Sequence, residues 1–378
     1  MRWDRPLAQQ GAELEEFRAY LVRLLFLADV TVVDGSRPAL VAAHRAAWPA
    51  GIRVLTPDGR AGLNGKVVGA LSGIAAARHE LVVLADDDVR YDEASLTAMY
   101  RALGGADVVR PQNVFTEWPW HARWDFARSL LARAFAADWP GTFGLRASAV
   151  AAMGGWSADV LFENLEMVRA AQASGHVVVN LPGLVVGRRP APARHFWSQR
   201  VRHAYDDLAQ PWRLAAELGI IPLVTASAVW RPSLLVVLAA AAVALAEVGR
   251  RRFGGLDIPG SVPLWAPAWV FERGVCTWLA LGARARGGVR YHGQRLRVAA
   301  HAPSRLAKGS RLVPSAVRGP AVPRLGDPDL HAGHRVAGLQ EETAPTASGT
   351  PGSRCGGRGW PGGAGCGAGS RPPGWRPW

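Results

Sequence analysis

The chain has few cysteines and almost no lysine. Its 378 residues include three cysteines, Cys276, Cys355 and Cys366, which are too few and too late in the sequence for a disulfide framework or a zinc site. We therefore expect a protein of a reducing compartment. Lysine occurs only at Lys66 and Lys308, so arginine supplies almost all of the positive charge.

A recognisable nucleic-acid-binding motif is also missing, although the formal net charge is +14. A composition so skewed toward arginine is explained at least as well by a general residue bias as by a phosphate-binding face. Because no DNA- or RNA-binding motif accompanies the charge, no nucleic-acid partner is expected. A basic, nucleic-acid-associated protein is a rival interpretation that rests on charge alone.

A run of three carboxylates, Asp86, Asp87 and Asp88, follows the apolar residues 81–85. A buried strand that ends in acidic residues brings them to the rim of a sheet, where ligands of open α/β folds bind. Carboxylates this close raise one another's pKa, and a divalent cation relieves the repulsion. One interpretation is therefore a metal that holds a diphosphate. The alternative is an acidic turn that caps the next helix, since Asp92 follows.

Two upstream segments favour the ligand-binding interpretation. Residues 28–36 predict a short β-branched strand that ends in Asp34 and a turn. Apolar residues at helical spacing then predict a helix over residues 64–77, before the strand at 81–85. Strand, helix and strand in this order form a βαβ unit, so we expect the acidic ends of both strands at one edge.

From this point the chain resembles a known enzyme family. The run NGKVVGALSGIAAARHELVVLADDDV is similar to the glycine–lysine helix, strand and DxD motif of family-2 glycosyltransferases, which have the GT-A nucleotide-sugar fold. Three later motifs keep the family's order: GGW at residues 154–156, FENLE at 162–166 in place of Glu–Asp, and QRVRH at 199–203 in place of QxxRW. The resemblance covers about residues 20–300 and leans toward membrane-anchored, lipid-modifying enzymes of the ceramide glucosyltransferase type.

The resemblance implies a metal-dependent donor site. Asp86 and Asp88 would coordinate Mg2+ or Mn2+ that bridges the phosphates of a UDP- or GDP-sugar, and Asp87 would point elsewhere because neighbours along a strand alternate. Asp34 would face the nucleoside, and Lys66 would lie near the diphosphate. These charges would neutralise the oxyanion that forms as the glycosyl bond breaks. For Lys66, the alternative is an exposed residue at a helix start.

The general base is implied less directly, because the sequence departs from the family at this position. Family members use an aspartate to take the acceptor proton, whereas this chain has Asn164, which cannot accept a proton usefully. Glu163 precedes it, and Glu166 follows one helical turn later, so a carboxylate is within reach. Glu163 is the first candidate for the base and Glu166 the second. The alternative is that both are surface helix acids.

The QRVRH run implies contacts with the diphosphate or the acceptor head group. Gln199 and Arg202 would make them, arginine as a planar donor fork for phosphate. His203 replaces the tryptophan with which processive polymerases hold a growing chain, so one sugar per acceptor is predicted. The family's acceptor loop corresponds to residues 140–142, and several tryptophans precede it: Trp118, Trp120, Trp124 and Trp139. They could stack on sugar or lipid, with core packing as the alternative.

The second half of the chain carries long apolar stretches. Residues 214–230 and 233–248 are each near the length that crosses a bilayer. A hairpin that turns at Pro232 would place Arg213 and the arginines at 250–252 together on the cytoplasmic side. Buried helices of a soluble protein are the alternative.

Three further segments complete the organisation. Residues 262–282 form a third apolar stretch, which could span, re-enter or lie on the membrane surface. Residues 195–197, His-Phe-Trp, suit either a helix at the membrane surface or an amphipathic helix on the catalytic domain. From residue 303 onward, a composition rich in Gly, Pro, Arg and Ser predicts a disordered tail.

The sequence thus predicts an α/β protein with a GT-A, Rossmann-like nucleotide-sugar domain at 1–210, two or three membrane-associated helices at 211–302 and a disordered tail at 303–378. The predicted function is inverting transfer of a single sugar to a lipid-linked or membrane-proximal acceptor, with the catalytic domain on the cytoplasmic side of the cell membrane. A degenerate protein that binds nucleotide sugar without turnover is the rival. Asn164, His203 and the lack of a recognisable first strand before Asp29 suggest it.

Overall fold

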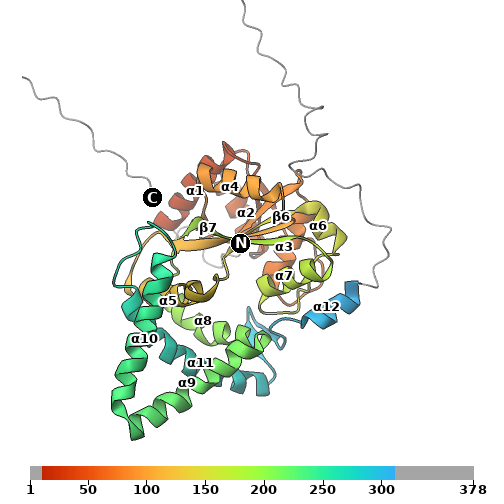
Figure 1. Ribbon diagram of the computed structural model, residues 1–378. Coiled ribbons are helices and arrows are strands. Elements are labelled where there is room, and N and C mark those ends of the chain that lie inside the picture. Colours follow the sequence, from red (N-terminus) through yellow and green to blue (C-terminus); the bar gives the residue numbers. More distant parts are fainter. Residues whose placement is uncertain (1–10, 311–378) are drawn as a thin grey trace, which may run out of the picture. The chain divides into compact units, whose positions relative to one another are not determined.

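The computed structural model describes residues 11–310, with side chains up to residue 307. These residues form a mixed α/β unit whose helices surround a central five-stranded sheet (Figure 1). The α/β class predicted from the sequence is confirmed. Cys355, Cys366 and the part of the predicted tail beyond residue 310 lie outside the described residues.

The first two strands form a small sheet of their own. β1 (Thr31–Val33) pairs in parallel with β2 (Arg53–Leu55), and α2 (Pro38–Ala47) connects them. α1 (Gly11–Leu25) packs on this sheet with apolar residues at helical spacing. The cluster that results is made of Leu14, Phe17, Tyr20, Leu21, Val32 and Trp48. The strand predicted within residues 28–36 is confirmed.

The expected βαβ unit is only partly correct. α3 (Gly65–Ala75), which Asn64 caps, and β3 (Leu81–Ala85) form as predicted. However, β3 pairs with β6 and not with β1, so the two predicted strands lie in different sheets. β1 packs against α3 instead, at Gly73, where a Cβ would lie only 2.9 Å from Val33 Cγ2. A cavity lined by both β1 and β3 separates the two strands.

The central sheet is mixed and has the order β3, β6, β5, β7, β4. Only β5 and β7 are parallel neighbours. The strands that follow β3 are β4 (Val89–Arg90), β5 (Val108–Phe115), β6 (Thr142–Arg146) and β7 (Val178–Arg188). β3 and β4 lie at opposite edges of this sheet, the acidic run 86–88 connects them, and the pairing of Val89 with Arg188 brings the end of β7 beside that run.

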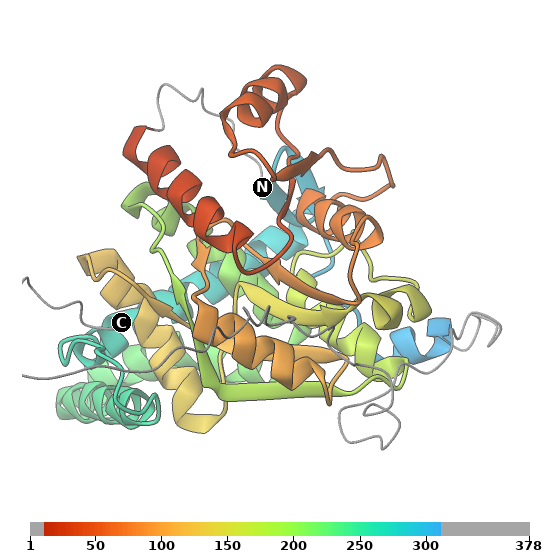
Figure 2. The ribbon, with the colours of Figure 1, turned by 90° about the horizontal axis from the view of Figure 1, so that it is seen from above.

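Helices pack on both sides of this sheet. α4 (Glu93–Leu103) lies across β5, β6 and β7 (Figure 2), and it begins at Asp92, which accepts a hydrogen bond from the Ser95 backbone N–H. The helix-capping interpretation of the acidic stretch is therefore correct for Asp92. The remaining helices around the sheet are α5 (Trp120–Phe135), α6 (Ala147–Ala152), α7 (Glu163–Ala173) and α8 (Ala193–Tyr205). The main core includes Val67, Leu71, Leu145, Met167 and Ala171.

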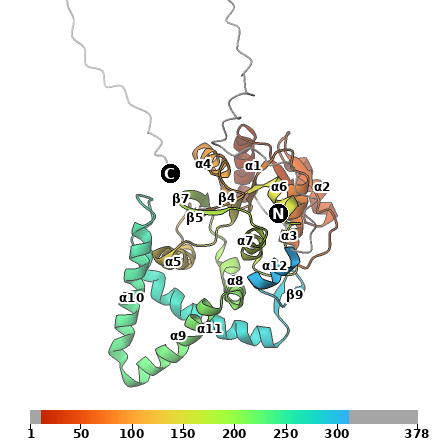
Figure 3. The ribbon, with the colours of Figure 1, turned by 45° about the vertical axis from the view of Figure 1, so that its right-hand side comes forward.

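After α8, the short helix η2 (Asp206–Ala209) leads into a helical hairpin. α9 (Pro211–Trp230) and α10 (Pro232–Arg251) meet at Arg231, which confirms the predicted turn at Pro232. Figures 1 and 3 show the tip of this hairpin far from the sheet. Within the described residues, these two helices are long and apolar enough to cross a membrane, and only 11% of each apolar window is buried.

The third apolar stretch packs against neighbouring helices with one face, while large apolar side chains on its other face are exposed, among them Phe271, Trp278 and Leu279. It forms η3 (Pro263–Trp265) and α11 (Ala266–Ala285), and α11 contacts α5, α8, α9 and α10. Its charged pair, Glu272 and Arg273, is buried and binds Arg200 and Asp207. α11 is not among the two helices of the described chain that meet the length and composition of a membrane span.

A small hairpin and a last helix end the described chain. The hairpin consists of β8 (Val289–Tyr291) and β9 (Gln294–Leu296). α12 (Pro303–Ser310) contacts α7, so the first eight residues of the predicted disordered tail are helical. The ordered region therefore extends beyond the boundary that composition predicted.

The close contact of α10 with α5 predicts the effect of a single methyl group. A Cβ at Gly249 would lie 1.9 Å from the Leu130 carbonyl oxygen, whereas Gly219, in α9, has no atom within 4 Å of its Cβ position. We expect Gly249→Ala to lower the free energy of unfolding by about 1–3 kcal/mol, as overpacking does. Gly219→Ala should be neutral or stabilising by up to about 1 kcal/mol, since alanine favours helix. Thermal unfolding in detergent measures both, and equal midpoints would contradict this packing.

Candidate functional site

A cavity of about 1590 Å³ lies beside the free edge of β3. Six of the eight residues predicted for the site line this cavity: Lys66, Asp86, Asp88, Glu163, Gln199 and Arg202. Asp34 and Glu166 do not. The structure thus brings together residues from α3, β3, α7 and α8 that lie far apart in the sequence.

Lys66 is at the centre of this arrangement. Its Nζ lies 2.8 Å from Asp86 Oδ1 and 2.9 Å from Glu163 Oε1. Burial alone would lower the pKa of Lys66, but the two carboxylates more than offset this, so the pKa is raised and the ammonium stays charged. One cation therefore joins the acidic end of β3 to the first residue of α7.

Arg188, which is not among the site residues predicted from the sequence, supplies a second cation. At the end of β7, its Nε lies 2.9 Å from Asp88 Oδ2, and its Nη2 lies 3.7 Å from Asp86 Oδ2. The sequence feature that could have indicated Arg188 is its position as a basic residue at the end of an apolar strand. Only the pairing of β7 with β4 shows that this strand end lies beside the acidic run.

The two aspartates are affected in opposite directions. Burial would raise the pKa of Asp86, but Lys66 and Arg188 together hold it below its usual value. For Asp88, burial and the neighbouring charges of Asp86 and Asp87 outweigh Arg188 and raise the pKa. Asp86 is therefore the carboxylate already neutralised by protein cations, and Asp88 is the one that still needs positive charge.

The residues present fit a divalent cation at Asp88. Its Oδ1 is buried and accepts no hydrogen bond from any described group, which is costly for a carboxylate oxygen. No cluster of three or more His, Cys, Asp or Glu residues suited to a metal occurs in the part of the chain that the structure describes. Mg2+ is commonly held by only one or two carboxylates together with substrate phosphates, so this donor set suffices.

Asp34 is engaged in holding the β1–α2 turn. Its side chain is fully buried, and its Oδ2 lies 2.6 Å from His44 Nδ1. Its Oδ1 accepts a hydrogen bond from the Ser36 backbone N–H at 2.9 Å. Burial would raise its pKa, but these partners lower it. The predicted contact of Asp34 with a nucleoside finds no support in this geometry, because the carboxylate faces α2.

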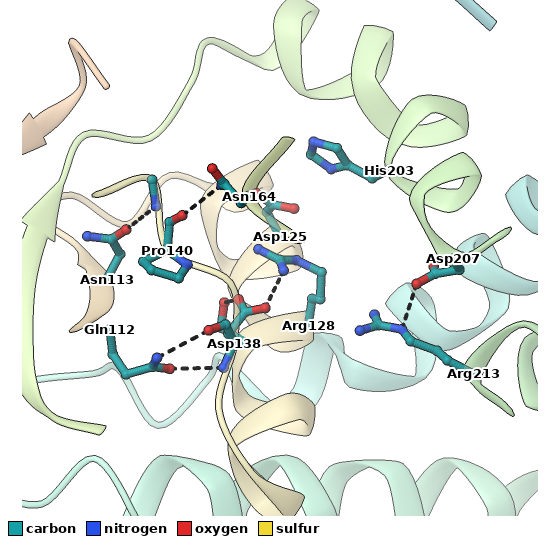
Figure 4. Close-up of polar contacts among 12 residues, drawn as sticks. Gln112, Asn113, Asp125, Arg128, Asp138, Pro140, Asn164, His203, Asp207 and Arg213 are labelled. Carbon is teal, nitrogen blue, oxygen red and sulfur yellow. Dashed lines mark hydrogen bonds and ion pairs between the residues drawn. The ribbon is translucent and has the colours of Figure 1, made fainter. Parts of the chain in front are cut away.

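The loop before β6 lies beside the charged cluster and is fixed by two side-chain hydrogen bonds (Figure 4). Asn164 donates from Nδ2 to the Pro140 carbonyl at 3.2 Å, and Asn113 Oδ1 accepts from the Gly141 backbone N–H at 2.7 Å. A Cβ at Gly141 would lie 2.9 Å from Asp86 Oδ2. Glycine thus lets this loop approach the charged cluster closely.

Glu166 has a structural role. Its side chain is fully buried, and its two oxygens accept hydrogen bonds from the His301 backbone N–H and from His301 Nδ1, each at 2.7 Å. These bonds fasten α7 to the segment before α12. The Glu166 side chain therefore faces His301 and not the cavity, which argues against a role as the base.

The QRVRH run lies along one wall of the cavity. Arg202 places its guanidinium 5.2 Å from the centre of the Tyr291 ring, and Gln199 contacts His195. His203 is partly buried beside Arg200 and Asp125; burial and Arg200 lower its pKa well below the usual value, so the imidazole is neutral. In this structure, Arg202 is the residue of the run that can meet an anion in the cavity.

The predicted tryptophans divide into packed and exposed groups. Trp139 packs against Phe162 and under Arg110, while Trp118 packs against Phe126. Trp120 contacts Trp197 but remains 44% exposed. Core packing therefore accounts for the first two, and Trp120 and Trp197 form an exposed aromatic pair between α5 and α8.

A segment that contains part of this site is similar to a family of known proteins. Residues 31–110 match the family model described as Glycosyl transferase family 21. This segment extends from β1 into β5 and includes Lys66, Asp86 and Asp88. No curated protein matches the chain.

Several solved structures are similar at low identity. A mannosyltransferase from Pyrobaculum calidifontis, in complex with GDP-Man and Mn2+, is 16% identical over 73% of this chain and 85% of its own, with a TM-score of 0.42. S. aureus TarS 1–349 with UDP-GlcNAc is 13% identical over 74% and 91% of the two chains, with a TM-score of 0.34. M. tuberculosis glucosyl-3-phosphoglycerate synthase is 13% identical over 52% and 82%, with a TM-score of 0.29.

Proposed function

We propose that the protein is a metal-dependent, inverting glycosyltransferase of the GT-A type. It would move one sugar from a UDP- or GDP-sugar to a hydroxyl group of a lipid-linked or membrane-proximal acceptor. The observation that carries the proposal is the joining of Asp86, Lys66 and Glu163 by ion pairs of 2.8 and 2.9 Å in one cavity. Lys66 and Asp86 lie within the segment that matches the glycosyltransferase family 21 model.

The chemistry of the donor explains why this cluster suits the reaction. When the bond between sugar and diphosphate breaks, negative charge accumulates on the leaving diphosphate. Lys66 and Arg188 are fixed cations at the place where that charge would develop, and a preorganised charge lowers the barrier without reorganisation. Asp88 with Asp86 would hold Mg2+ or Mn2+, which would further neutralise the charge on the diphosphate.

The acceptor would enter at the end of the cavity formed by the start of α7. Inversion requires the acceptor hydroxyl to attack from the side opposite to the diphosphate, with a carboxylate nearby to take its proton. Of the two carboxylates that the sequence suggested as the base, Glu163 lines the cavity and Glu166 does not. Glu163 binds Lys66, which also binds Asp86 at the donor end of the cavity. This link would fix the position of the acceptor relative to the donor.

The hairpin of α9 and α10 supports a membrane location. Its exposed residues include large apolar side chains: Trp212, Val229, Trp230, Val236 and Val237. The basic residues Arg213 and Arg250 lie at its open end, next to the catalytic unit. Insertion of the hairpin tip into the cell membrane would leave these arginines and the cavity on the cytoplasmic side.

A protein that binds nucleotide sugar without turnover is the second candidate. Asn164 favours it, because its amide is bound to the Pro140 carbonyl and cannot take a proton. Release of nucleoside diphosphate from a panel of UDP- and GDP-sugars, measured with detergent-solubilised protein and lipid acceptors, separates the two. Binding without release would support the second candidate.

The metal site gives the first functional prediction. Asp88→Asn should abolish transfer and remove the effect of EDTA on nucleotide binding. Stability should stay near that of the wild type, because the change relieves the crowding of carboxylates. The matched control is Asp92→Asn, which makes the same chemical change at a helix cap outside the cavity and should keep full activity. An Asp88→Asn protein that transfers sugar in EDTA would rule out the metal.

The membrane anchor gives the second functional prediction. Val237 and Ala241 are exposed one turn apart on α10. Replacing both with aspartate should release much of the protein from salt-washed membranes, since each intramembrane aspartate costs about 2.5–3.5 kcal/mol. Replacing both with leucine is the control and should leave the protein in the pellet. Retention of the aspartate variant in the membrane fraction would argue against insertion of this hairpin.

A further inference from the structure

One carboxylate that lines the cavity takes no part in the proposed donor site. Asp206 is the first residue of η2, directly after α8, and it lines the same cavity as Glu163. Its Oδ1 is buried and accepts no hydrogen bond from any group in the described part of the chain. An unpaired buried carboxylate oxygen is costly, so its retention needs a reason.

The other residues considered for the base are already engaged. Glu163 binds the Lys66 ammonium at 2.9 Å, Asn164 donates to Pro140, and Glu166 binds His301 outside the cavity. A carboxylate that stabilises a neighbouring cation is a poorer proton acceptor than one without such a partner. Asp206 has no ion pair with any described cation within 4 Å, which leaves its oxygen available to a substrate.

We propose that Asp206 is the catalytic base that takes the proton of the acceptor hydroxyl, in place of the aspartate that Asn164 replaces. This inference rests on the proposed function. Glu163 then acts as a positioning residue that ties the acceptor end of the cavity to Lys66 and the diphosphate.

The proposed step is balanced in atoms and charge. The acceptor oxygen forms a bond to the anomeric carbon of the sugar while the bond from that carbon to the diphosphate oxygen breaks. The electron pair of the broken bond leaves with the diphosphate, next to Lys66 and Arg188. The hydroxyl proton passes to the Asp206 carboxylate, which later releases it to solvent.

The surroundings of Asp206 favour a base that works at moderate pH. Burial raises its pKa well above the usual value, and the charges of Glu163 in α7 and Asp207 in η2 raise it further. Arg202 of α8 and Arg273 of α11 oppose this increase. From α9, Arg213 is paired with Asp207. A base with a pKa closer to the working pH accepts a proton more readily than an ordinary aspartate.

The test compares Asp206→Asn with the wild type by release of nucleoside diphosphate and by formation of glycosylated acceptor. We expect turnover to fall about 10²- to 10⁴-fold, the range of general-base effects, with donor affinity little changed. Thermal unfolding should show stability at or above that of the wild type, because the amide removes an unpaired buried carboxylate. Asp206→Glu should retain part of the activity, and Asp92→Asn serves as the control outside the cavity.

Two further variants separate a base from a merely structural residue. Asn164→Asp in the Asp206→Asn background should restore turnover at least about tenfold, because it returns a carboxylate to the same end of the cavity. Glu163→Gln should keep measurable turnover and move the acid limb of the pH–rate profile to lower pH. The sign follows from Asp206, which is inactive when protonated: removing the negative charge of Glu163 lowers the pKa through which activity is lost.

The outcomes distinguish the inference from the proposed function. If wild-type protein turns over a donor and Asp206→Asn does so equally well, Asp206 is not the base, while glycosyl transfer stands. If Glu163→Gln removes all turnover without a shifted profile, Glu163 is the base. If wild-type protein releases no nucleoside diphosphate from any donor, the proposed function fails and Asp206 has no proton to take.

Discussion

The Lys66 ammonium is the interaction on which the site depends. It sits at the start of α3 and binds two carboxylates, Asp86 from the end of β3 and Glu163 from the start of α7. Without this cation the two carboxylates would face each other and Arg188 would be the remaining positive charge beside Asp86. Local capping by Asn64 fixes where the helix begins and therefore where the ammonium lies. A single helix start thus organises the charged end of the cavity.

Buried ion pairs connect the helices around the cavity to one another. Arg200 of α8 binds Asp125 of α5 at 2.7 Å and Glu272 of α11 at 3.5 Å, and Arg273 binds Asp207 at 3.2 Å. Breaking one partner of such a pair leaves an uncompensated buried charge, so these contacts fix the relative positions of the helices. The wall of the cavity that carries Arg202 and Asp206 is held by them. Consequently α11 belongs to the architecture of the site, although its apolar composition suggested a membrane segment.

Prediction from sequence succeeded where the signal was local. The strand at 81–85, the helix that begins at Asn64 and the hairpin at Pro232 follow from apolar periodicity, a capping side chain and a proline, each within a few residues. It failed where the outcome depended on distant partners. The strand at 31–33 formed, but it paired with β2, because the pairing of strands is decided by how sheets and helices pack. Arg188 and Asp206 were not identified as site residues for the same reason.

The sequence by itself determined the α/β class, the acidic strand end, the cationic helix start and two apolar helices joined at a proline. Only the tertiary structure decided which carboxylates face the cavity. Glu163 and Glu166 are one helical turn apart, yet one binds Lys66 in the cavity and the other binds His301 outside it. Helical periodicity places two residues on neighbouring positions of a helix, but the groups that surround the helix decide which one meets solvent, a partner or a substrate. Those groups come from segments more than a hundred residues away in the case of His301, so no local pattern contains them.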